Sequence, residues 1–123
     1  MMQYMETELA RAETEECIQN CEECHRVCTE TLTYCLQMGG RHMETEHLRL
    51  LHDCIQICRT SADFMRRGSP FHGLTCGICA IVCENCMEDC LRVDEDDPQM
   101  RACAHVCRRC TDSCRQMASI VAG

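Results

Sequence analysis

The hydrophobic and polar positions of this chain follow a helical period along its whole length. Cysteine and apolar side chains recur at steps of three and four residues, and no stretch shows the alternation of a half-buried β-strand. Glycine- and proline-containing breaks interrupt the pattern at three places. The sequence therefore predicts four helices, over about residues 4–38, 44–67, 70–93 and 98–121.

The three breaks are short and carry strong helix-stop signals. Gly39-Gly40 ends the first segment, Gly68-Ser69-Pro70 separates the second from the third, and the acidic loop 94–98 precedes the fourth. Because short connections favour antiparallel neighbours, we predict an all-α, up-down-up-down four-helix bundle that forms one domain over residues 1–123. Residues 1–14 are polar and cysteine-free, and we expect an N-terminal extension that projects past the bundle or folds back as a separate short helix.

Cysteine marks the inner face of this predicted bundle. Steps of three and four place the cysteines on the a/d seam, where a bundle normally carries leucine. The chain has 16 of them: Cys17, Cys21, Cys24, Cys28, Cys35, Cys54, Cys58, Cys76, Cys79, Cys83, Cys86, Cys90, Cys103, Cys107, Cys110 and Cys114. Only Cys54 and Cys58 lie on the second helix, where Leu51 and Met65 continue the seam. We therefore expect thiols stacked in layers along the bundle axis.

The cysteine pattern has two alternative interpretations. Buried cysteine can serve as a small hydrophobic residue, but a core built from thiols alone has too little volume. Disulfides are the second alternative, and neighbours on one helix rarely reach the required sulfur geometry. A cytosolic compartment also keeps thiols reduced, which favours metal binding over a disulfide framework.

Charge and composition argue against several classes of protein. The net charge of −8 argues against a nucleic-acid-binding protein. The N-terminus lacks the basic and apolar regions of a secretory signal, and no apolar run is long enough to span a membrane. We therefore expect a cytoplasmic protein.

The choice of metal rests on ligand softness and charge. Thiolates select Cu(I), Zn(II) or iron–sulfur clusters, and the Cys76-x2-Cys79 and Cys107-x2-Cys110 pairs resemble fragments of a ferredoxin motif. However, thiols on one face of a helix cannot surround an iron–sulfur cluster. Four Zn(II) on 16 thiolates would leave a buried charge of about −8, whereas sixteen Cu(I) would leave none. Charge balance and low coordination number favour Cu(I).

Methionines and histidines gather at one end of the predicted bundle. Met38, Met43, Met87 and Met100 cluster at the end that holds the first and third connections. Because thioethers bind Cu(I), Met38 and Met43 are candidate ligands. Methionine is also common core filler. His42 and His47 lie at the same end, and we interpret them as surface histidines.

The run Cys17-x3-Cys21-x2-Cys24-x3-Cys28, echoed over residues 76–90 and 103–114, resembles the bacterial copper storage proteins. The resemblance extends to the cysteine-poor second helix and to the break before Pro70. It implies a four-helix bundle whose inward cysteines bind many Cu(I) ions, and it places the chain with the cytosolic, tetrameric branch. It also suggests Asp53 and His105 as non-cysteine ligands, although neither lies on the a/d seam.

The sequence thus predicts high-capacity Cu(I) storage without catalysis, with copper delivered by a copper chaperone or a small thiol. A thiol–disulfide carrier and a zinc or cadmium buffer stay open as alternatives. The carrier needs an accessible cysteine of low pKa, usually at a helix N-terminus. Only Cys76 and Cys103 come near predicted helix starts.

Overall fold

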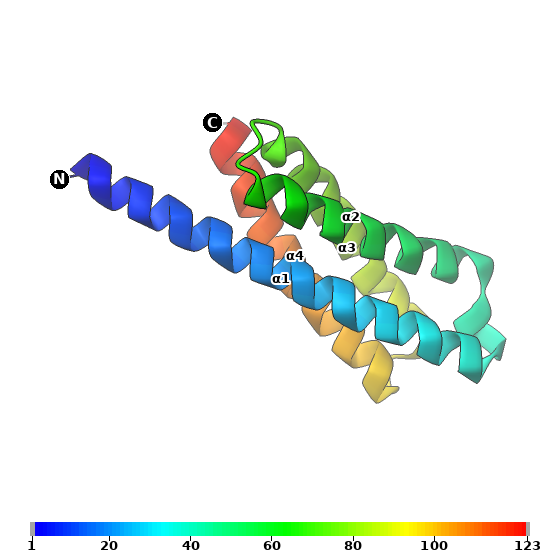
Figure 1. The fold of residues 1–123 in the computed structure, drawn as a ribbon. Helices are drawn as coiled ribbons and strands as arrows, with labels where there is room; N and C mark the ends of the chain where they lie inside the picture. Colours follow the sequence, from blue (N-terminus) through cyan, green and yellow to red (C-terminus); the bar gives the residue numbers. More distant parts are fainter. Residues whose placement is uncertain (1, 123) are drawn as a thin grey trace.

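The computed structural model describes the backbone of residues 2–122 and the side chains of residues 8–118. Within that part of the chain there are four α-helices and no strand. The helices are α1 (Met2–Met38), α2 (Thr45–Arg66), α3 (His72–Asp94) and α4 (Pro98–Ala122). Each helix packs against the next, and α4 closes against α1, so the four form an antiparallel bundle (Figure 1). The predicted fold class is confirmed.

Helix α1 is much longer than the others. It has 37 residues, against 22, 23 and 25 in α2, α3 and α4. Its N-terminal part runs past the bundle as a continuation of the same helix (Figure 1). Cys17 is the first buried residue of α1 in the described side chains, and Leu9 lies exposed before it. Of the two forms expected for this extension, the projecting one is present.

The connections hold two details that the sequence pattern did not predict. A single 3-10 turn, η1 (Gly40–Met43), lies between α1 and α2, and Gly39 and Gly40 take φ values of 69° and 59°. Left-handed backbone of this kind favours glycine, which explains the pair. Helix α3 begins at His72 rather than at Pro70, because the Ser69 hydroxyl and carbonyl first accept the Phe71 and His72 amides in a turn.

The bundle core consists mainly of cysteine. All 16 cysteines are buried, and Leu51 is the only fully buried leucine among the described side chains. On α2, Leu51 and Met65 are buried on the same side as Cys54 and Cys58, as the seam predicts. The layered thiol interior is therefore confirmed. Helix α2 contributes only two thiols, and its other core positions carry side chains that are not cysteine.

Candidate metal centre

The sulfur atoms of the core approach one another across helices. Cys28 Sγ lies 3.6 Å from Cys103 Sγ, and Cys54 Sγ lies 3.6 Å from Cys83 Sγ. All 16 cysteines are free thiols, so the disulfide alternative has no counterpart in the structure. Separations of 3.6 to 3.9 Å recur along the axis. Such spacing suits two or three sulfur donors around one soft ion.

The thiols also form groups of four whose sulfurs all lie within 4.8 Å of one another. Five such groups are Cys21/Cys79/Cys110/Cys114, Cys24/Cys28/Cys54/Cys107, Cys24/Cys54/Cys58/Cys83, Cys28/Cys86/Cys103/Cys107 and Cys58/Cys79/Cys83/Cys110. Because most members belong to more than one group, no boundary separates one site from the next. The core is a continuous array of donors.

The buried thiols perturb one another's ionisation. The hydrogen bond with the Cys107 thiol stabilises the Cys103 thiolate, which lowers the pKa of Cys103, while the same contact raises the pKa of Cys107. Cys35 has no such support, and burial raises the pKa of Cys35 to about 11. Metal binding to the thiols with a raised pKa, such as Cys35 and Cys107, must therefore displace protons.

A different set of donors lies at the end of the bundle that holds η1. Here Cys35 Sγ lies 3.4 Å from His47 Nε2 and 3.8 Å from Met100 Sδ, and all three side chains are buried. The interpretation of His42 and His47 as surface histidines is wrong, since both are buried. His42 stacks edge-on against Tyr34, with ring centroids 5.9 Å apart.

The heptad pattern contained the signal for two of these residues. His47 stands four residues before Leu51 and seven before Cys54, and Met100 stands three before Cys103. Both continue the cysteine seam by one step toward the same end of the bundle. The fully buried Thr31, between Cys28 and Cys35, is a third seam position without a cysteine.

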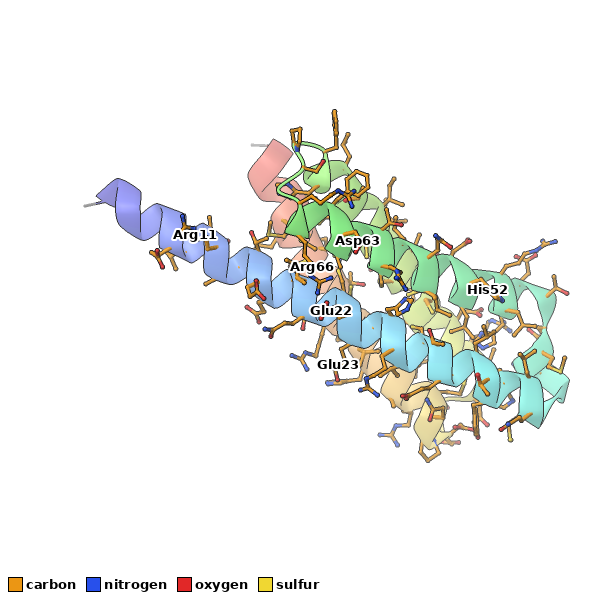
Figure 2. The ribbon with its side chains drawn as sticks, in the orientation of Figure 1. Arg11, Glu22, Glu23, His52, Asp63 and Arg66 are labelled. Carbon is orange, nitrogen blue, oxygen red and sulfur yellow. The ribbon has the colours of Figure 1, made fainter. Side chains whose placement is uncertain are left out.

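The four non-cysteine candidates lie elsewhere. Asp53 and His105 are exposed, and Met38 and Met43 are 53% and 44% exposed. Asp53 borders a surface hollow with its neighbour His52, which projects from the outer face of α2 (Figure 2). No described contact joins any of the four to a core sulfur. Their part as copper ligands stays a prediction that this arrangement does not support.

The outer surface of the bundle is charged. Arg66 on α2 pairs with Glu22 on α1, and Arg115 on α4 pairs with Glu84 on α3. Figure 2 shows Glu22, Glu23 and Arg66 on the outside of the helices. Within the described residues, no helix is long and apolar enough to cross a bilayer.

Comparison with known proteins relates this cysteine array to one family. A family model described as copper storage protein matches residues 10–119. The chain belongs to the copper storage protein family. The match begins inside the projecting part of α1 and covers the whole thiol core.

Individual relatives of the family agree in length and fold. The uncharacterized cysteine-rich protein YhjQ of Bacillus subtilis is 36% identical over 106 residues, which cover 86% of this chain and 96% of that protein. The Cu(I)-bound copper storage protein BsCsp3 is 34% identical, with a TM-score of 0.80 over 86% of this chain and 98% of its own. A cytosolic copper storage protein from Streptomyces lividans, loaded with five coppers, is 26% identical, with a TM-score of 0.79 over 90% of this chain and 96% of its own.

Proposed function

We propose that this protein stores Cu(I) in the cytoplasm on the cysteine thiolates of its bundle core. The observation that carries the proposal is the overlap of the four-thiol groups, which offers soft donors along the bundle axis without interruption. Membership of the copper storage family and the Cu(I)-bound state of a relative support it. Sixteen thiolates neutralise sixteen Cu(I) ions, so a filled core carries no net charge.

The role is storage without catalysis. A thiol–disulfide carrier needs an accessible thiol to attack its partner. Every cysteine here is buried, which disfavours thiol exchange with another protein. Copper reaches the core from a carrier, either a copper chaperone or a small thiol, and each ion releases a proton from the thiol it binds.

The assembly we propose is a homotetramer. One outward face of α3 supports this proposal, because it carries apolar side chains at helical spacing. Leu74, Ile78 and Ile81 on α3, and Phe71 directly before it, are each between 54% and 69% exposed. A contiguous apolar strip of this kind marks an interaction surface.

Titration of the reduced apo protein with Cu(I), against a chromophoric Cu(I) chelator, tests the storage function. We expect each chain to bind more than about ten equivalents of Cu(I) before the chelator begins to bind Cu(I). Saturation at about four or fewer would contradict storage and would favour a zinc-type buffer with closed tetrahedral sites. A thiol count on the same apo protein separates storage from a redox carrier, since storage predicts that all 16 cysteines are free.

A further inference from the structure

The thiol array ends, on the η1 side, in a layer of mixed chemistry. Helix α1 contributes Cys35, α2 contributes His47 and α4 contributes Met100, and none of the three is more than 1% exposed. The Cys35 sulfur faces the other two donors at 3.4 Å and 3.8 Å. These separations match those between the core thiols that share four-donor groups. Three soft or borderline donors from three helices thus meet in a dry environment.

The orientation of the His47 ring is fixed from outside this layer. Its Nδ1 lies 2.7 Å from Asp89 Oδ2 on α3, and the other oxygen of Asp89 accepts a hydrogen bond from Arg92 at 2.9 Å. A carboxylate only accepts hydrogen bonds, so Nδ1 carries the proton in the neutral ring and Nε2 keeps its lone pair. Nε2 therefore points toward Cys35 as an acceptor. A carboxylate behind a histidine is the usual support of a metal-bound imidazole.

We propose that Cys35, His47 and Met100 form a mixed thiolate–imidazole–thioether Cu(I) site that terminates the array. The inference rests on the proposed storage function, because it takes Cu(I) as the cargo. When Cu⁺ binds, Cys35 loses its thiol proton to solvent and a neutral complex forms with two uncharged donors. Thioether and thiolate ligands select Cu(I), and one anionic ligand leaves Zn(II) with uncompensated charge.

This site differs from the rest of the store in that two of its three donors, His47 and Met100, are not thiols. It also gives the terminal ion two neutral ligands, which makes that ion detectable through nitrogen and methyl resonances that the all-sulfur layers lack.

Substitution of the two neutral donors tests the assignment. Met100→Leu removes the thioether at nearly constant volume, and His47→Gln removes the imidazole. Met117→Leu is the matched control, because Met117 is also buried but lies at the opposite end of the core. We expect Met100→Leu and His47→Gln each to lose one Cu(I) equivalent, and Met117→Leu to lose none.

Nitrogen NMR of the wild-type protein supplies a readout that does not depend on any variant folding. Loading with Cu(I) should shift the His47 Nε2 resonance as a ligated nitrogen shifts, while Nδ1 stays protonated. An unshifted Nε2, or full capacity in Met100→Leu, would overturn the mixed site and leave cysteine storage intact. Failure of the wild-type protein to bind more than a few ions would instead remove the storage function itself.

Discussion

The hydroxyl of Tyr34 on α1 donates a hydrogen bond to Oδ2 of Asp97, the residue that precedes α4. The other oxygen of Asp97 accepts the backbone amides of Gln99 at 2.8 Å and Met100 at 3.3 Å, which caps the first turn of α4. His42 Nε2 lies 3.6 Å from the same carboxylate. One loop residue, 8% exposed, thereby joins α1, η1 and α4 at the end where the mixed layer lies.

Removal of this carboxylate should destabilise the apo protein. Asp97→Ala loses a helix cap and leaves the Tyr34 hydroxyl without its partner, at a cost of about 1–3 kcal/mol. Denaturant unfolding followed by circular dichroism measures the loss. Asp96→Ala is the control, since Asp96 is exposed on the same loop. Equal unfolding midpoints for the two variants would show that Asp97 does not hold this end together.

The ionisation of Asp97 should make the stability of the fold depend on pH in the acid range. Burial works to raise the pKa of Asp97, but the Tyr34 hydroxyl and the Met100 and Gln99 amides outweigh it and lower the pKa below its usual 3.8. A carboxylate whose pKa is lower in the folded protein than in the unfolded chain stabilises the fold at pH values above its unfolded-state pKa. That stabilisation is lost as the pH falls through the lowered, folded-state pKa. The stability advantage of wild type over Asp97→Asn should therefore shrink as pH falls from about 5 to about 3. A constant difference across that range would contradict this account.

The apolar face of α3 should control assembly without affecting copper. Ile78→Glu places a charge in the centre of the exposed strip and should convert the assembled protein to smaller species in light scattering after gel filtration. Leu9→Glu is the matched control, because Leu9 is similarly exposed but lies on the projecting part of α1. We expect the same number of Cu(I) equivalents in both variants. An unchanged mass for Ile78→Glu would place the interface elsewhere.

The projecting start of α1 should be dispensable for storage. Deletion of residues 1–9 removes no cysteine and leaves Thr14, whose hydroxyl lies 3.9 Å from the Met117 sulfur. Copper capacity and melting temperature should stay close to those of the full chain. Deletion of residues 1–16 also removes the contacts of Thr14 and Glu13 with α4 and should lower the melting temperature. Loss of capacity in the shorter deletion would give the extension a role in loading.

The heptad steps of the cysteines predicted the helices, their inward faces and the thiol layers. That prediction worked because a cysteine every three or four residues has few other physical explanations. His47 and Met100 occupy the same seam, but a single histidine or methionine at such a position is common core filler. Their convergence on Cys35 depends on the relative heights of α1, α2 and α4.

The sequence pattern did not predict the burial of His42, for a related reason. It depends on the η1 turn, which brings the ring against Tyr34 and close to Asp97. Tyr34 lies on the preceding helix and Asp97 much farther along the chain, and only the reversal of the chain at η1 brings them together with His42. The exposure of Asp53 and His105, by contrast, follows from their positions beside rather than on the seam.

Copper should tie α2 to the rest of the bundle through its two thiols. Cys54 and Cys58 both contact Cys83 on α3 at 3.6 Å, and Cys54 also lies 3.8 Å from Cys24 on α1. An ion shared across these pairs links the helices by metal–sulfur bonds, and ligand binding to the folded state alone contributes about 4 kcal/mol at a thousand times its Kd. Copper loading should therefore slow amide hydrogen exchange throughout α2.

The double variant Cys54→Ala/Cys58→Ala isolates this effect, at a cost of about 1 kcal/mol per lost sulfur in the apo state. We expect it to bind fewer Cu(I) ions and to gain little exchange protection in α2 on loading. Cys86→Ala/Cys90→Ala removes the same number of thiols from α3 and should keep the copper-dependent protection of α2. Equal protection of α2 in both double variants would mean that copper stabilises the bundle as a whole rather than through the thiols of this helix.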